Sequence, residues 1–219
     1  MTTPTTIDVH APTRPTSAET IPTRRVAVVI ALLLLGATAT FLTGDALVVQ
    51  ALDGPRVDTG GLMLGVALQT LNAVAVAGLG VAFLRVLPSH VRRLALGHLV
   101  LRIVEAVVIV GIGGWMIATE SLVDYEPVVY VFTGSAGLLL TAALARTGLV
   151  ERPLVRLGAV GYVAILCALP LQLLTTTSLD SVPGLLLYVP GALFELFLPL
   201  LLLARGFREP NSGRRRPRA

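Results

Sequence analysis

Three ionisable side chains lie inside long apolar stretches of the sequence, where charge is rare. Arg102 and Glu105 are three residues apart within the apolar stretch 94–117, and Glu195 lies within the stretch 184–204. A central Arg or Asp costs about 2.5–3.5 kcal/mol on membrane-insertion scales, so such residues face the interior of a helix bundle and pair or bind there. Arg102, Glu105 and Glu195 are therefore candidate ligand-binding residues.

Three uncharged polar side chains are placed to join them. Gln69 and Asn72 are about one helical turn apart in the apolar stretch 61–84, and Tyr188 precedes Glu195 by seven residues on the same predicted helix face. We add Gln69, Asn72 and Tyr188 to the candidate ligand-binding residues.

Four of these side chains are expected at one depth. At about 1.5 Å of rise per residue, each lies near the midplane of a hydrocarbon core about 30 Å thick. They are Asn72, Arg102, Glu105 and Glu195. One Arg against two Glu leaves a formal charge of −1, which suits a cation or a proton better than an anion. This cluster favours a small permease or a ligand-binding membrane protein.

Each element also has a structural interpretation, which stays open at this point. Arg102 and Glu105 can form an ion pair that only fixes helix packing. Glu195 can be a protonated acid bonded to a neighbouring helix, and Gln69 and Asn72 can hold helices together. The alternative function is a structural or regulatory membrane subunit whose buried charges lock the bundle.

The composition indicates which elements must position these residues. Of the 219 residues, 54% are hydrophobic and 14% are charged, whereas soluble domains carry about 25% charged residues. We predict an all-α integral membrane bundle of six transmembrane helices in residues 24–208, between a disordered Thr/Pro-rich tail (1–23) and an Arg-rich tail (209–219). The predicted spans are 26–43, 61–84, 94–117, 127–145, 157–174 and 184–204.

The charge distribution predicts the orientation. The basic residues are all arginines, and all but Arg56 and Arg102 lie in the predicted tails and loops of one side. By the positive-inside rule both termini are cytoplasmic, and we expect a multi-pass protein of the plasma membrane. The pair Arg24-Arg25 and the triplet 37–39 leave a cleaved signal peptide open as an alternative for the first span. The Lys-free, Ala- and Leu-rich composition is typical of a GC-rich bacterial genome.

Other functions find little support. No nucleophile, metal-ligand spacing or cofactor motif indicates an enzyme, so we expect no cofactor, no metal and no nucleic-acid partner. The expected partners are the lipid bilayer, a small molecule or cation, and further subunits of a homo- or hetero-oligomer. Several glycines within the spans are predicted to allow close helix packing: Gly78, Gly80, Gly111, Gly113, Gly114, Gly134 and Gly137.

Three short motifs resemble a known bacterial family of multi-pass membrane proteins, domain of unknown function 4386. Residues 102–106 (Arg-Ile-Val-Glu-Ala) resemble its Arg-x-x-Glu-Ala motif, and residues 148–161 resemble its loop into the fifth helix. Residues 195–207, with Glu195 and an Arg-Gly exit, resemble its last helix. The resemblance implies a membrane protein over about 24–208 and assigns no activity.

Overall fold

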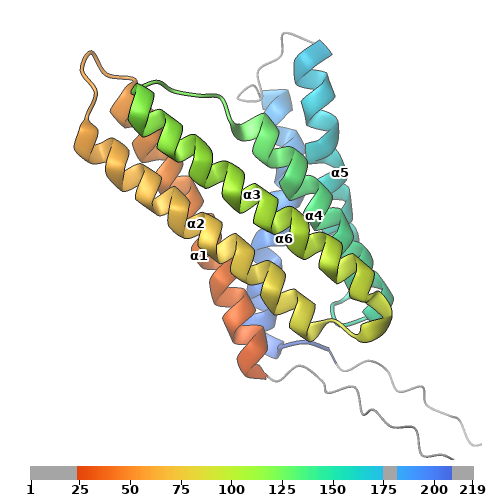
Figure 1. The fold of residues 1–219 in the computed structure, drawn as a ribbon. Helices are drawn as coiled ribbons and strands as arrows, with labels where there is room; N and C mark the ends of the chain where they lie inside the picture. Colours follow the sequence, from red (N-terminus) through yellow and green to blue (C-terminus); the bar gives the residue numbers. More distant parts are fainter. Residues whose placement is uncertain (1–23, 175–181, 209–219) are drawn as a thin grey trace, which may run out of the picture.

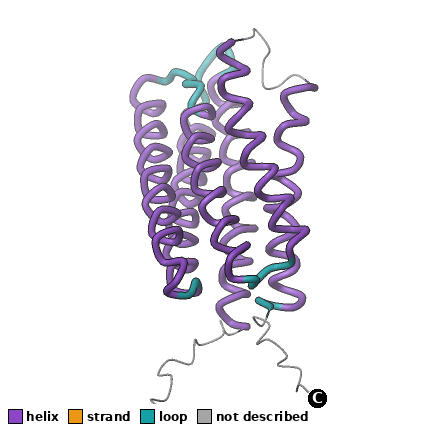
Figure 2. The backbone as a smooth tube through the Cα atoms, turned by 90° about the vertical axis from the view of Figure 1, so that its right-hand side faces the viewer, coloured by secondary structure: helices purple, strands orange, loops and turns teal. Residues whose placement is uncertain are grey.

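The protein is described here from a computed structural model that covers residues 24–174 and 182–208. These residues form six α-helices and a short 3-10 helix, Ser89–Val91, and contain no strand (Figures 1 and 2). The helices are α1 (Arg24–Leu52), α2 (Thr59–Val86), α3 (Arg92–Thr119), α4 (Glu126–Thr147), α5 (Arg152–Leu174) and α6 (Val182–Arg205). The tail 1–23, predicted to be disordered, and the Arg-rich tail 209–219 both lie outside the described residues.

Five of the six described helices have the length and composition of membrane spans. Within the described residues, five segments are long and apolar enough to cross a bilayer, one each from α1, α2, α3, α4 and α6. Large apolar side chains such as Leu42, Val74 and Trp115 are more than half exposed on the outer surface, as expected for helices surrounded by lipid. The predicted all-α membrane bundle is confirmed.

The helices form a ring in chain order. Each helix packs against its neighbours in the sequence, and α6 returns to pack against α1; the described residues show no packing between helices across the ring. Figure 1 shows α1 and α6 close together at the lower end and diverging towards the upper end. Arg24 donates to the carbonyl of Leu203 (3.4 Å) at the lower end, which fixes this convergence.

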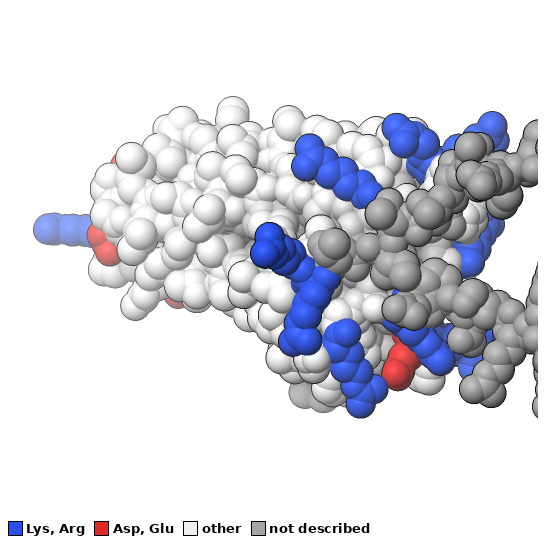
Figure 3. Space-filling model, turned by 90° about the horizontal axis from the view of Figure 1, so that it is seen from below, with Lys and Arg blue, Asp and Glu red and all other residues white. Residues whose placement is uncertain are grey.

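The two ends of the ring differ in charge. The lower end, called the basic end here, holds the start of α1, the α2–α3 and α4–α5 connections and the end of α6, and basic side chains group there (Figure 3). Its described arginines are Arg24, Arg25, Arg85, Arg92, Arg93, Arg146, Arg152, Arg156, Arg205 and Arg208. The opposite, acidic end holds Asp53, Asp58, Glu120, Asp124 and Glu126 beside Arg56.

The first helix is longer than predicted. The span 26–43 was expected to end before Gly44 and Asp45, yet α1 continues to Leu52. Gly44 lies against α2, where an added Cβ would meet the Gly65 carbonyl oxygen at 2.9 Å. The hydroxyl of Tyr125 donates to Asp45 (2.9 Å). The placement of Asp45 in a loop was therefore wrong, because close packing and a hydrogen bond keep both residues in the helix.

Glycines set the distances between most neighbouring helices. Added Cβ atoms at Gly80, Gly113, Gly134 and Gly137 would meet atoms of a neighbouring helix at less than 3.0 Å, which confirms these four packing positions. The prediction was wrong for two others, which face outwards and have no neighbour within 4 Å: Gly111 and Gly114. Gly78 makes only ordinary contact with Leu33, at 3.8 Å.

Candidate functional site

A cavity of ≈ 400 Å³ lies inside the ring and is lined by residues from all six helices. It separates two apolar cores, one that extends to the basic end and one near the acidic end. Its volume falls within the range of about 300–1,000 Å³ that is usual for small-molecule sites. Five of the six candidate residues line it: Asn72, Arg102, Glu105, Tyr188 and Glu195.

The Arg102–Glu105 pair forms the α3 wall of the cavity. Nη1 of Arg102 donates to both carboxylate oxygens of Glu105, at 3.0 and 2.9 Å, one turn away on the same helix. Thr133 of α4 adds a third hydrogen bond to Glu105, at 2.6 Å. Arg102 is 6% exposed and Glu105 is 3% exposed. Opposite charges with several hydrogen bonds between them allow both groups to be buried in apolar surroundings.

Arg102 keeps one donor unused. Its Nε–H is buried and has no hydrogen-bond partner among the described residues, although a guanidinium can donate five such bonds. Asn72 on α2, only 5% exposed, lines the same cavity and adds an amide that both donates and accepts. An unpartnered buried donor costs free energy, so the cavity is suited to a group that accepts a hydrogen bond.

Glu195 enters the cavity from α6. It is partly buried, and one oxygen accepts a hydrogen bond from the Tyr162 hydroxyl of α5, at 3.3 Å. Tyr162 is 2% exposed and packs edge-to-face on Phe194. Arg102 and Glu195 attract each other electrostatically. Glu195 is thus held by one long hydrogen bond and by the field of Arg102.

Two tyrosines form an aromatic wall of the cavity. The rings of Tyr130 on α4 and Tyr188 on α6 have centroids 5.1 Å apart and are tilted by 53°. Both residues line the cavity with Glu195. Aromatic faces attract cations by about 0.5–2 kcal/mol. This wall and the carboxyl group together suit a positively charged group.

The structure places Gln69 elsewhere. Gln69 donates to the hydroxyl of Tyr125 (2.8 Å), which donates to Asp45 (2.9 Å), so this chain connects α2, the residue before α4, and α1. Burial and the nearby Asp45 carboxyl raise the pKa of Tyr125 above its ordinary value of 10.0, so its hydroxyl stays protonated and can donate. Gln69 does not line the cavity and links helices near the acidic end.

His98, on the same face of α3 as Arg102, is not part of the cavity lining. It is 1% exposed, its Nδ1 pairs with the carbonyl of Ala136 (2.9 Å), and its ring packs edge-to-face on Phe83. Within the described ranges, no group of three or more His, Cys, Asp or Glu side chains could hold a metal ion. The polar atoms of the site therefore come from Arg, Glu, Asn, Thr and Tyr side chains.

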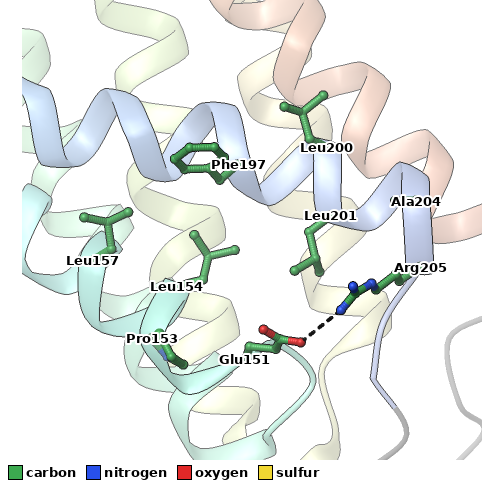
Figure 4. Close-up of a pocket in the computed structure, with 9 residues that line it drawn as sticks. All are labelled: Glu151, Pro153, Leu154, Leu157, Phe197, Leu200, Leu201, Ala204 and Arg205. Atoms are coloured by element: carbon green, nitrogen blue, oxygen red, sulfur yellow. Dashed lines mark hydrogen bonds and ion pairs between the residues drawn. The ribbon is translucent and has the colours of Figure 1, made fainter.

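A second pocket lies at the basic end between α5 and α6 (Figure 4). Glu151 and Arg205 face each other across its rim at 3.5 Å, and both side chains are largely exposed. Its other lining residues are mostly apolar, among them Leu154 and Phe197. An exposed ion pair contributes about 0–1 kcal/mol. This pocket holds no buried polar group to orient a ligand, so the cavity inside the ring is the candidate site.

Sequence reasoning missed two residues that define the site. Thr133 and Tyr162 supply the hydrogen bonds to Glu105 and Glu195 from the neighbouring helices. Both are polar residues inside predicted spans, which is the signal that could have found them. Tyr130 carried a weaker signal, because its position also fits an aromatic residue at the membrane interface.

Comparisons with known proteins agree with this description. No curated protein and no solved structure matches the chain. Residues 25–127 match the model of a family described as "Domain of unknown function (DUF4386)". The matched range includes Asn72, Arg102 and Glu105 and ends before Tyr188 and Glu195. The motif of residues 102–106 lies within it, whereas the motifs of 148–161 and 195–207 do not. Residues 25–127 of this multi-pass membrane protein, just under half of the chain, are therefore similar to the DUF4386 family.

Proposed function

We propose that this protein is a small permease or ligand-binding membrane protein that takes a cation in the cavity inside the ring. The observation that supports this proposal is the set of buried charged residues that line the cavity. The cavity lining holds one guanidinium, that of Arg102, and three carboxyl groups, those of Glu105, Glu126 and Glu195. Because Arg102 already pairs with Glu105, the remaining charge in the cavity is acidic.

Each lining group has a distinct proposed role. Glu195 is the counter-ion, since among the described residues it accepts one long hydrogen bond and is otherwise held by the field of Arg102. The wall formed by Tyr130 and Tyr188 supports a cation. The Nε–H of Arg102 and the amide of Asn72 hold an acceptor on the same ligand. Gln69 has no role in binding here and holds α2 to Tyr125.

A thermal-unfolding screen in lipid nanodiscs tests this proposal. The probes are tetramethylammonium and a series of primary amines, each beside the carboxylate of equal length. A ligand at 100 times its Kd stabilises the folded state by about 2.7 kcal/mol. We expect an amine or ammonium ion to raise the Tm of the wild type and to leave the Tm of Glu195→Gln unchanged.

Glu151→Gln is the matched control, because it removes the same charge from the exposed ion pair at the basic end. It should respond to the cation as the wild type does. An unchanged wild-type Tm with every cation, or an equal response in Glu195→Gln, would overturn the proposal.

A second candidate function is supported by the Arg102–Glu105 geometry. Three hydrogen bonds use both oxygens of Glu105: two come from Arg102 within α3, and the third, from Thr133, connects α3 with α4. In this second candidate function, the pair only stabilises helix packing, and the protein is a structural or regulatory subunit. In that case the cavity variants lower the Tm and no probe restores it, and co-purification of the protein from its native membrane should yield a stoichiometric partner.

We further propose that the basic end faces the cytoplasm of the plasma membrane, because positive charge is retained on that side during insertion. The test uses the exposed positions Ser89, at the basic end, and Ser121, at the acidic end. Each is changed to cysteine in a Cys167→Ser background and treated with a membrane-impermeant maleimide on intact cells. Only Ser121→Cys should be labelled, and labelling of Ser89→Cys alone would reverse the orientation.

A further inference from the structure

The mouth of the cavity lies between α1 and α6. Among the described residues that line the cavity, only four are exposed on the outer surface. They are Thr38 and Leu42 of α1 and Ala192 and Leu196 of α6. Lining residues from the other four helices are buried or partly buried, including those near the acidic end. The cavity therefore opens sideways, through the wall of the ring.

The mouth lies at the depth of the hydrocarbon core. Thr38 is at the centre of α1 (Arg24–Leu52), about 21 Å along the axis from its start. Ala192 is about 20 Å from the end of α6 at Arg205. Both helices have their basic ends together, so these positions lie level with each other and far from either end. A molecule at the mouth is surrounded by lipid chains.

Glycine packing explains why this seam is open. An added Cβ at Gly161 of α5 would meet the backbone nitrogen of Gly191, so α6 lies tightly against α5. Gly44 and Gly65 bring α1 close to α2, since an added Cβ at Gly44 would meet the Gly65 carbonyl oxygen at 2.9 Å. The helices α1 and α6 are thus drawn away from each other towards their other neighbours.

The inner surface next to the mouth is amphipathic. Leu34, Leu35 and Phe41 of α1 form an apolar side of the cavity, and Glu195 lies one turn from Ala192 on the opposite lip. A volume of ≈ 400 Å³ holds a polar head and part of a chain. The rest of a longer chain can extend through the mouth into the bilayer.

We propose that the cavity binds a lipophilic amine, which enters from the bilayer between α1 and α6 and places its ammonium group at Glu195. This inference rests on the proposed function and names its substrate class. The chain of the amine lies against α1 and continues into the lipid. Only molecules that partition into the bilayer reach the mouth, so water-soluble amines of the same head chemistry bind weakly.

The test compares dodecylammonium with butylammonium by thermal unfolding of the full chain in nanodiscs. Ala192→Trp fills one lip of the mouth with a bulky side chain. Ala67→Trp is the matched control, because Ala67 is also exposed but lies on α2 and does not line the cavity. Leu42→Trp, at a position of the other lip that is 61% exposed, repeats the block should Ala192→Trp not fold.

We expect dodecylammonium to raise the Tm of the wild type and of Ala67→Trp, and to have no effect on Ala192→Trp, Leu42→Trp or Glu195→Gln. Its apparent affinity for the wild type should exceed that of butylammonium by about tenfold or more, because the bilayer concentrates the longer chain at the mouth. Dodecanoate should give no shift.

Two results would overturn this inference and distinguish it from the proposed function. If butylammonium stabilises the wild type and Ala192→Trp equally, a cation site exists but is reached from water. In that case the proposed function stands and the lateral route is wrong. If neither amine shifts the wild type and tetramethylammonium does not either, both the route and the cation site are wrong.

Discussion

Two carboxyl groups in one cavity are held in very different ways. Glu105 accepts two hydrogen bonds from Arg102 and one from Thr133, all between 2.6 and 3.0 Å. Glu195 accepts one bond of 3.3 Å from Tyr162 and lies next to the mouth. Glu105 is 3% exposed, and Glu195 is only partly buried.

The difference separates structure from binding. A buried carboxylate with its lone pairs occupied and its counter-ion one turn away has little capacity for a ligand, and breaking its pair is costly. A carboxylate with a single long bond can exchange that bond for a ligand at small cost. We therefore propose that Glu105 holds α3 to α4 and that Glu195 binds the ligand.

The largest expected effect comes from Arg102→Ala, which removes the counter-ion of Glu105. It should lower the free energy of unfolding in nanodiscs by about 3–5 kcal/mol, because an unpaired charge stays buried. The double variant Arg102→Leu/Glu105→Leu is the control and should recover most of this loss. Equal destabilisation by both variants would show that lost packing, and not the ion pair, causes the effect.

Thr133→Val should have the next largest effect. It removes the hydrogen bond from α4 to Glu105 and preserves the shape of the side chain, so we expect a loss of about 1 kcal/mol. Thr147→Val is a matched control, since the Thr147 hydroxyl bonds only to backbone carbonyls of its own helix. The free energy of unfolding is measured for both variants. An equal loss of stability in the two would show that the hydrogen bond from Thr133 to Glu105 does not stabilise the contact between α3 and α4.

Tyr162→Phe should cost less, about 0.6 kcal/mol, which is the average for a hydrogen bond between membrane helices. The ring, with its packing on Phe194, is kept. Because Glu195 then has no partner on α5, we expect the variant to bind dodecylammonium at least as tightly as the wild type. Lost binding at unchanged stability would mean that Tyr162 itself contacts the ligand.

The smallest change in stability is expected for Glu195→Gln. Glutamine can accept the same bond from Tyr162 and requires no counter-ion, so the free energy of unfolding should stay within about 0.5 kcal/mol of the wild type. The same variant should lose the Tm shift with dodecylammonium completely. A stability loss similar to that of Arg102→Ala would show that Glu195, like Glu105, holds helices together.

Much of the fold could be predicted from the sequence, because apolar stretches and arginine-rich ends identify helices and their connections. The depths of Arg102, Glu105 and Glu195 followed from the rise per residue. The rotation of each helix about its axis did not, because lipid and neighbouring helices are equally apolar and leave little amphipathic pattern. For this reason the sequence predicts Gly111 at a helix contact, although it faces outwards. It also predicts Gln69 among the ligand-binding residues, whereas its side chain bonds to Tyr125.

The boundaries depended on long-range contacts. From the sequence alone, Gly44 and Asp45 interrupt the apolar stretch, and only their contacts with Gly65 and Tyr125 show why the helix continues. The mouth of the cavity is likewise a property of two helices distant in the sequence. Its position depends on glycine pairs that join α1 to α2 and α5 to α6, which no local pattern reveals.

One measurement tests the division between the two carboxyl groups most directly. Unfolding free energies of the wild type, Glu105→Gln and Glu195→Gln are determined in the same nanodiscs with and without dodecylammonium. We expect Glu105→Gln to be destabilised by several kcal/mol in the absence of amine, because Arg102 loses its counter-ion. Glu195→Gln should keep wild-type stability and show no response to the amine. Retained binding in Glu195→Gln together with wild-type stability in Glu105→Gln would contradict the assignment of both residues.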